Sequence, residues 1–212
     1  MKKGFMLVVD GGNGAGKTTV IEKIRNFSEE KGVEVIVTRE PGGTPIGEKI
    51  RELILDPETP EMFDTTELLL FAAARAQHLH EKILPALEQG KVVVSDRFDT
   101  ATISFQHYAR NIDIDLIHKI NGSAVGDFKP AMNLILDIDP ELGLQRVHQR
   151  GEKLDRLEKE KLTFLDKARK GYLTQAEQEP DRFRIVDASQ PKEAVEIEAL
   201  KVVDELLKQF EA

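Results

Sequence analysis

The 212 residues are enough for one sizeable α/β domain, and 40% hydrophobic with 32% charged residues is typical of a globular protein. The net charge of −8 argues against a nucleic-acid-binding surface, and the absence of cysteine excludes disulfides and thiolate metal sites. The apolar run at the N-terminus ends at Asp10, too early for a secretory signal, and no later run could span a bilayer. We therefore expect a cytoplasmic, single-domain protein over residues 1–212, with no membrane and no nucleic-acid partner.

Short apolar runs alternate with helical patterns along the chain. The runs predict five strands, at 5–9, 33–38, 92–95, 134–138 and 183–186. Helical spacing between them is clearest at 46–55, 67–88, 140–150, 158–179 and 191–210. This alternation predicts an α/β fold with a mainly parallel sheet and right-handed crossovers. Ligands should then bind beyond the carboxyl ends of the strands.

A glycine-rich loop follows the first predicted strand. Residues 11–18 read GGNGAGKT, a full match to the phosphate-binding pattern G-x-x-x-x-G-K-[ST]. Glycines let backbone N–H groups turn around phosphate oxygens, and the next helix adds its positive N-terminal end. Lys17 would reach the β- and γ-phosphates, and the Thr18 hydroxyl would bind Mg²⁺. The alternative is a tight glycine turn with a solvated lysine.

Charged residues follow the next two predicted strands. Arg39 opens the turn REPGGT after the second strand, where a guanidinium can hold an oxyanion through two hydrogen bonds. Asp96 and Arg97 close the third strand, and they suggest a Mg²⁺ ligand beside an arginine for phosphoryl charge. The alternatives are a surface turn and a local ion pair. We favour a second phosphate site because parallel strands bring these ends to one edge.

Two further patterns leave alternatives open. Phe71 and Arg75 lie one helical turn apart in an apolar stretch, so they are either a base-binding pair or a core phenylalanine with a snorkelling arginine. The polar segment RGEKLDR at 150–156 is either a lid over phosphates or a solvated connection between helices. The turn at 187–191 also fits a plain helix N-cap. The five histidines show no metal-ligand spacing.

Seven segments together resemble thymidylate kinases of the bacterial form, from end to end of the chain. They are GGNGAGKTT (11–19), TREPGGT (38–44), LLLFAAARAQH (68–78), DRF (96–98), LILDIDPELGLQR (134–146), RGEKLDRLE (150–158) and DASQP (187–191). The resemblance implies a three-layer P-loop kinase fold, with a five-stranded parallel sheet flanked by helices and a small lid at about 150–157. It also implies a homodimer that uses Mg²⁺ and transfers the γ-phosphoryl group of ATP to dTMP.

The resemblance further implies roles for individual residues. The implied catalytic residues are Lys17, Arg97, Arg150 and Arg156, and the implied metal ligands are Thr18 and Asp96. The implied ATP site comprises Gly11, Gly12, Asn13, Gly14, Ala15, Gly16, Lys17, Thr18, Thr19, Arg146, Ser189 and Gln190. The implied dTMP site comprises Asp10, Asn13, Arg39, Phe71, Arg75, Arg97, Thr102, Phe105 and Gln106. The chain departs from the family at Asn13, where Asp or Glu is usual, and at Asp10, where Glu is usual, so sugar and metal contacts are the details expected to differ.

Two other functions stay open from the residues. One is another nucleotide or nucleoside kinase, in which residues 98–109 would hold a different base preference. The other is a P-loop ATP-binding switch without phosphotransfer. Arg39, Arg97 and the 150–156 segment argue against the switch, because a switch needs no second phosphate site.

Overall fold

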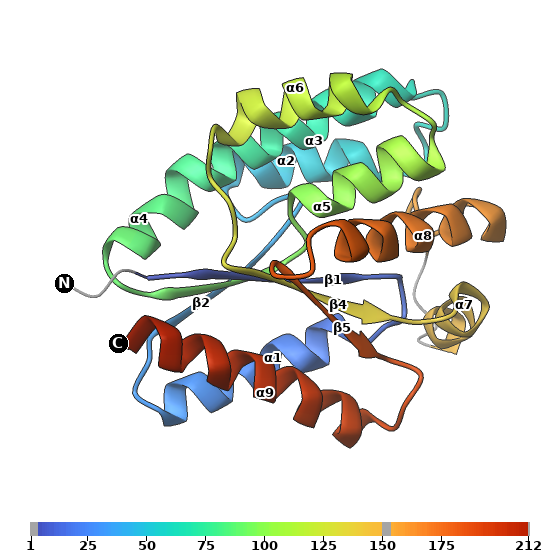
Figure 1. The fold of residues 1–212 in the computed structure, drawn as a ribbon. Helices are drawn as coiled ribbons and strands as arrows, with labels where there is room; N and C mark the ends of the chain where they lie inside the picture. The colour runs from blue at the N-terminus through green and yellow to red at the C-terminus, as the bar shows by residue number, and fades with distance from the viewer. Residues whose placement is uncertain (1–3, 150–153, 212) are drawn as a thin grey trace.

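The computed structural model describes residues 4–149 and 154–211 and has a five-stranded parallel sheet at its centre, in the order β2-β3-β1-β4-β5 (Figure 1). The strands are β1 (Met6–Gly11), β2 (Val35–Arg39), β3 (Val92–Asp96), β4 (Met132–Asp137) and β5 (Phe183–Asp187). All five predicted strands are present, each within about two residues of its expected bounds, which is the usual precision of such boundaries. The predicted parallel α/β sheet is confirmed.

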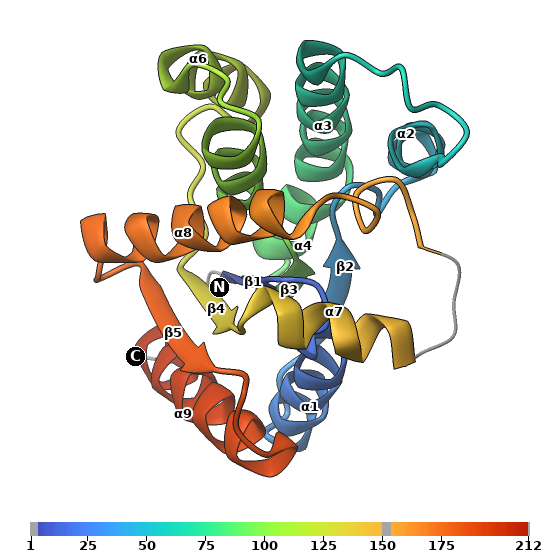
Figure 2. The ribbon, with the colours of Figure 1, turned by 90° about the vertical axis from the view of Figure 1, so that its right-hand side faces the viewer.

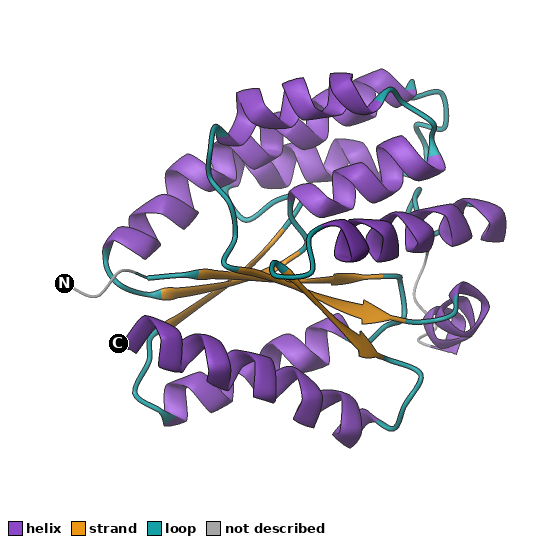
Figure 3. Ribbon diagram, viewed as in Figure 1, coloured by secondary structure: helices purple, strands orange, loops and turns teal. Residues whose placement is uncertain are grey.

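Helices cover both faces of this sheet, which gives the expected three layers (Figures 1 and 3). One face carries α1 (Lys17–Glu30) and α9 (Lys192–Glu211). The other side carries α2 (Pro45–Leu55), α3 (Asp64–His78), α4 (Leu84–Glu88), α5 (Asp99–Thr102), α6 (Ile114–Val125) and α8 (Leu162–Gln178). Helix α7 (Pro140–Gln149) lies at the carboxyl ends of the strands (Figure 2). Within the described ranges, no helix is long and apolar enough to cross a membrane.

Several helix boundaries differ from the predicted ones. The predicted helix 67–88 starts three residues earlier and contains a π-helical segment, Leu79–Ile83, between α3 and α4. The predicted helix 158–179 starts only at Leu162, because the Asp155 carboxylate accepts hydrogen bonds from the backbone N–H groups of Leu157 and Glu158 and folds this stretch into turns. Position 150, the predicted end of α7, lies outside the described residues.

Two helical stretches were not among the predicted helices. The first combines α5 with the π-helical segment Ile103–Ala109, and the second is α6. Helix α6 contains Asn121, Gly122 and Ser123, which are poor helix formers, so its helical signal in the sequence is weak. Packing of its buried residues Ile117, Asn121 and Ala124 stabilises it instead.

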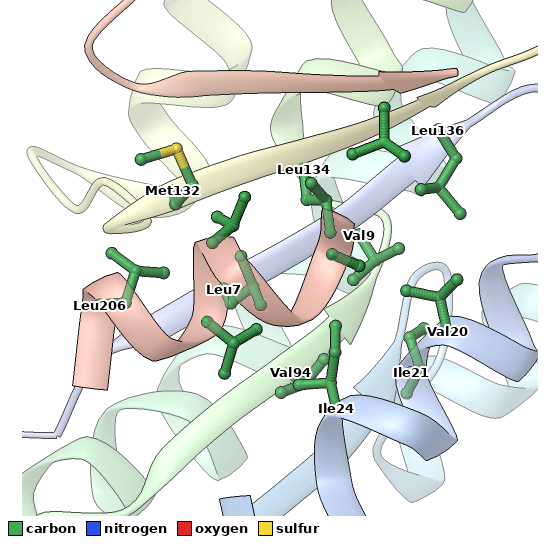
Figure 4. Close-up of a cluster of buried hydrophobic side chains, with 14 of the residues drawn as sticks. Leu7, Val9, Val20, Ile21, Ile24, Val94, Met132, Leu134, Leu136 and Leu206 are labelled. Carbon is green, nitrogen blue, oxygen red and sulfur yellow. The ribbon is translucent and has the colours of Figure 1, made fainter. Parts of the chain in front are cut away.

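Alternation along β1 sets up two hydrophobic clusters, one on each face of the sheet. Leu7 and Val9 pack with α1 and α9 in the larger cluster, where Ile24 and Leu206 are also buried (Figure 4). Met6 and Val8 point to the opposite face, in a cluster that includes Leu79, Ile83, Val93 and Phe98. Because β1 is buried at every position, its carboxyl end and the loop that follows start from a rigid support.

The strand register brings the predicted functional positions together. Val9 of β1 is opposite Asp96 of β3, and Asp96 is opposite Arg39 of β2. The carboxyl ends of three strands therefore lie side by side at the edge that Figure 2 faces. Ligand sites in open parallel sheets form at this edge.

Candidate active site

A cavity of about 240 Å³ opens at this edge of the sheet. Its wall combines segments far apart in the chain: the glycine loop, the REPGG turn, α2, α3, the end of β3, the π-helical segment after α5, and part of the predicted lid. Its lining includes Asn13, Lys17, Thr18, Arg39, Arg51, Phe71, Arg75, Asp96, Arg97, Thr102, Phe105 and Gln106. Most of the residues implied for dTMP thus share one cavity with the head of the glycine loop.

The glycine loop wraps around the start of α1 and is held from outside by α7. Gly14 has a φ of 77°, and a Cβ there would lie 2.2 Å from the Gly143 carbonyl oxygen, so only glycine fits this contact. The Lys17 ammonium group donates to the carbonyl oxygens of Gly11 (3.3 Å) and Gly12 (3.1 Å). The lysine head group is therefore folded over the loop, at the place where phosphates bind loops of this kind.

Arg97 is fixed in the cavity wall by its backbone and by three acceptors. Its φ of 71° is rare for a residue with a side chain, and its carbonyl oxygen accepts from Ser95 Oγ (2.8 Å). Its guanidinium donates to Asp10 Oδ1 (2.8 Å), Asn13 Oδ1 (3.0 Å) and the Tyr172 hydroxyl (2.8 Å). Burial alone lowers the pKa of Arg97, but Tyr172 and Asp10 together raise it above its ordinary value. These contacts hold a cation in the cavity wall, as the role implied for Arg97 requires.

Asp10 and Asn13, where the chain departs from the family pattern, both accept hydrogen bonds from Arg97. Asp10 is fully buried beneath the cavity rather than in its wall, where it accepts from Arg97, Tyr172 and the Gly11 backbone N–H. Burial, the largest influence, raises the pKa of Asp10. Asn13 provides an amide oxygen to Arg97 in place of a carboxylate. No motif identified Tyr172, because it lies inside α8 and looks like an ordinary core residue in the sequence.

A pair of arginines lies at the corner between the REPGG turn and α2. Arg39 donates to Glu48 Oε2 (2.9 Å), and Arg51 donates to the Pro41 carbonyl oxygen (2.9 Å). Burial, followed by the charge of Arg39, lowers the pKa of Arg51, so two cations repel each other beside the same cavity. A bound anion would relieve this repulsion. Arg51 was not among the predicted site residues, because its only signal in the sequence is a cation near a turn.

Asp96 and Thr18, the implied metal ligands, have the chemistry and placement that a Mg²⁺ site would need. Asp96 Oδ1 is buried and has no hydrogen-bond partner among the described residues. Thr18 lines the same cavity, and both residues also line an adjoining groove. A carboxylate and a hydroxyl are suitable oxygen ligands, since Mg²⁺ takes most of its other ligands from water and substrate phosphates.

Arg75 lies at the opposite end of the cavity and is almost completely buried, at 1% exposure. Its guanidinium donates to Glu40 Oε2 (2.9 Å), Asn121 Oδ1 (2.7 Å), the Phe98 carbonyl oxygen (3.1 Å) and Thr102 Oγ1 (2.9 Å). The snorkelling interpretation is therefore wrong, because a snorkelling arginine keeps its head group in water. Phe71, one turn earlier on α3, is half-buried and lines the same cavity, as the base-binding interpretation requires.

A buried polar chain connects Arg75 to the REPGG turn. The second Glu40 oxygen is 3.0 Å from His78 Nδ1, and His78 Nε2 is 2.7 Å from Thr38 Oγ1. All four side chains are buried, so each satisfies a group that would otherwise be costly to desolvate. The chain fixes Arg75 relative to the turn that carries Arg39.

The part of the predicted lid that the structure describes is bound near the base end of the cavity. Arg156 donates to the Ile54 carbonyl oxygen (2.8 Å) and forms an ion pair with Glu67. The lid residues Asp155, Leu157 and Glu158 line the cavity, but Arg156 does not. The implied position of Arg156 beside the transferring phosphoryl group therefore differs from its position in this structure, because Glu67 holds its guanidinium. Arg150 lies outside the described residues.

The implied adenine end is formed by α7 and the turn after β5. Arg146 donates to the carbonyl oxygens of Ala188 (2.9 Å) and Gly14 (3.4 Å), so it links this turn to the glycine loop. Ser189 and Gln190 are exposed, and both donate to the Asp187 carboxylate. Their hydrogen bonds shape a strand-to-helix turn beside the loop.

Acid is expected to destabilise the protein partly through Glu67. Burial alone raises its pKa, but Arg110, Arg156 and Gln106 outweigh burial and hold the pKa below its ordinary value of 4.5. A lowered carboxyl pKa stabilises the fold above about pH 4.5, and this contribution is lost as the pH falls through the lower pKa of the folded state. Urea unfolding between pH 7 and pH 3 should show a steeper loss of unfolding free energy in the parent than in Glu67→Gln. Equal losses would contradict this role.

Phosphate-binding groups on two sides of one cavity define a class of protein. The glycine loop, Lys17 and Thr18 would form one phosphate site, and the arginine pair Arg39 and Arg51 would form another, with Arg97 in the wall of the same cavity. A P-loop switch has no use for the second site, whereas a P-loop phosphotransferase requires it. The fold and site are those of a P-loop phosphotransferase.

Comparisons with known proteins identify the family. The sequence model of the thymidylate kinase family matches residues 9–199. The chain is 47% identical to the thymidylate kinase of Hahella chejuensis over 92% of this chain and 94% of that protein, and 46% identical to that of a Geobacillus species over 91% and 92%. The crystal structure of the Ehrlichia chaffeensis thymidylate kinase superimposes with a TM-score of 0.75 at 31% identity, covering 95% of this chain and 99% of that chain. The chain belongs to the thymidylate kinase family, so the predicted family and its fold are confirmed.

Proposed function

We propose that the protein transfers the γ-phosphoryl group of ATP to dTMP, giving dTDP and ADP. The observation that carries this proposal is the single cavity that joins the head of the glycine loop to Phe71 and Arg75. ATP would place its phosphates on residues 11–19, with adenine near Arg146 and the turn at 188–190. The dTMP phosphate would lie between Arg39 and Arg51, and its base would stack on Phe71. Neither alternative function receives support from the relatives.

Positioning and charge stabilisation account for most of the proposed catalysis. A phosphate oxygen of dTMP is already a competent nucleophile, so the reaction needs no general base. Lys17 and Arg97 would stabilise the charge that develops between donor and acceptor. Bound Mg²⁺, held by Thr18 and Asp96, would neutralise charge on the β- and γ-phosphates. We further propose that the chain is one domain that works as a homodimer in the cytoplasm, with a lid at about 150–157.

A coupled assay of ADP release tests the proposal directly. The protein is given ATP and Mg²⁺ with dTMP, dUMP, dGMP, dCMP or thymidine, one at a time. We expect dTMP to give the highest kcat/KM. A higher value for another acceptor would replace dTMP with that acceptor, and ATP binding without turnover of any acceptor would indicate a switch.

Substitutions of Arg39 and Arg156 should have different kinetic effects. Arg39 lies at a fixed strand end beside the proposed acceptor phosphate, so Arg39→Ala should raise the KM for dTMP about tenfold or more and change kcat less. Arg156 lies in the proposed lid and would leave Glu67 for a phosphate group when the lid closes. Arg156→Ala should therefore mainly lower kcat. Steady-state kinetics of both variants test this division. The control is Arg184→Ala, an exposed arginine of β5 that lines neither the cavity nor the adjoining groove. Equal increases in KM with unchanged kcat would contradict the division.

A further inference from the structure

A second buried carboxylate besides Glu40 lies behind the base end of the cavity, in contact with the lining residue Gln106. Glu67 is 1% exposed and accepts hydrogen bonds from Gln106 Nε2 (2.9 Å), Arg110 Nε (2.9 Å) and Arg110 Nη2 (3.1 Å), and it pairs with Arg156. Donors therefore hold both of its oxygens. Gln106 is itself 1% exposed and lines the cavity. The contact joins a carboxylate inside the protein to an amide at the ligand site.

The chemistry of this contact fixes which way the Gln106 amide faces. An ionised carboxylate only accepts hydrogen bonds, so the amide must turn its NH₂ group toward Glu67. Three donor side chains keep Glu67 ionised, and its pKa lies below the ordinary value. The other end of the amide, Oε1, has no hydrogen-bond partner among the described residues, and this oxygen is not fully buried. An amide oxygen, which is an acceptor, thus remains for a ligand in the cavity.

This acceptor lies beside a group that only donates. Thr102, four residues before Gln106 on the same helical stretch, accepts from Arg75, and all three residues line the cavity. A guanidinium has no acceptor, and it has more N–H groups than its four contacts use. The cavity therefore presents a donor and an acceptor together at its base end.

We propose that Glu67 is a positioning residue that sets base choice by holding Gln106 with its amide oxygen toward the base. Thymine and uracil carry a carbonyl oxygen next to a ring N–H, which complements a donor and an acceptor in that order. Cytosine carries an amino group next to an unprotonated ring nitrogen. Its amino donor would face the Arg75 donor, and its ring-nitrogen acceptor would face the Gln106 acceptor. This inference rests on the proposed function only in taking a nucleoside monophosphate as the ligand.

Dissociation constants test the inference without depending on turnover. They are measured by calorimetry for dTMP, dUMP and dCMP with the parent and with Glu67→Gln. The amide in Glu67→Gln can donate to Gln106, so the Gln106 side chain is free to turn over. We expect the preference for dTMP over dCMP to fall about tenfold or more, the usual effect of one mismatched buried hydrogen bond, while the preference for dTMP over dUMP stays the same. An unchanged dTMP/dCMP preference in the folded variant would overturn the inference.

Two controls separate positioning from a general loss of structure. Arg110→Gln removes another partner of Glu67 and keeps the Gln106 contact, so the dTMP/dCMP preference should remain that of the parent. In a Gln106→Leu background, Glu67→Gln should have no further effect on this preference, because the amide that it positions is gone. A change of preference in the first control, or a full effect in the second, would assign Glu67 a structural role only.

The parent protein gives a separate test should Glu67→Gln fail to fold. A dTMP analogue methylated at the ring N–H cannot donate to an acceptor in the cavity, so it should bind at least about tenfold more weakly than dTMP. Equal binding would show that no acceptor faces the base, and the inference would be overturned. Binding of dTMP without release of ADP would contradict the proposed function and leave these binding results as they stand.

Discussion

Replacing Lys17 with alanine is expected to lower kcat for phosphoryl transfer by about 100-fold or more, with the fold retained. The lysine head group donates to the Gly11 and Gly12 carbonyl oxygens, and Lys17 lines the cavity. It would leave these contacts for the β- and γ-phosphates, whose charge is greatest in the transition state. Steady-state kinetics with saturating ATP and dTMP measure kcat, and circular dichroism shows whether the fold is retained.

The matched control for this substitution lies on the same helix. Lys23→Ala removes an exposed lysine of α1 that does not line the cavity, so kcat should stay close to that of the parent. Activity of Lys17→Ala within about threefold of the parent would remove Lys17 from the proposed mechanism.

Replacing Arg75 with alanine is expected to have the largest effect on stability, a loss of about 3–5 kcal/mol in the free energy of unfolding. The substitution leaves Glu40 as a buried carboxylate without its cation, and it removes the donor to Asn121, Phe98 and Thr102. Urea unfolding monitored by circular dichroism measures the loss. Since Arg75 is also the proposed donor to the base carbonyl, surviving folded protein should have lost most of its preference for dTMP over dCMP.

A double-mutant cycle distinguishes the buried ion pair from simple loss of packing. Glu40→Gln alone leaves a buried cation short of a partner, whereas Glu40→Gln combined with Arg75→Met removes both charges. We expect the double variant to be more stable than the sum of the single changes by about 1 kcal/mol or more. Additive effects would mean that the pair is not coupled. Arg25→Ala, an exposed position, should change stability by less than about 0.5 kcal/mol.

The parts of the fold that follow from local sequence patterns were predictable. The buried strands are visible in the sequence as apolar runs, and the glycine loop has a spacing that few other structures require. The positions of Arg39, Asp96 and Arg97 just after strands were enough to place them at one edge, because parallel strands share the direction of their carboxyl ends. Helix α6 was not predicted, because its stability comes from packing rather than from helix propensity.

The sequence by itself thus determined the sheet, the phosphate loop, the family and the residues at the strand ends. Only the tertiary structure decided how these residues are held. Tyr172 meets Arg97 and Asp10 across 75 and 162 residues of chain, and Glu67 meets Gln106 and Arg156 across 39 and 89. A buried donor or acceptor must find a partner wherever the fold brings one, so its partner leaves no periodic signal in the sequence. For the same reason, the choice between a snorkelling Arg75 and a buried one depended on where the fold placed Glu40.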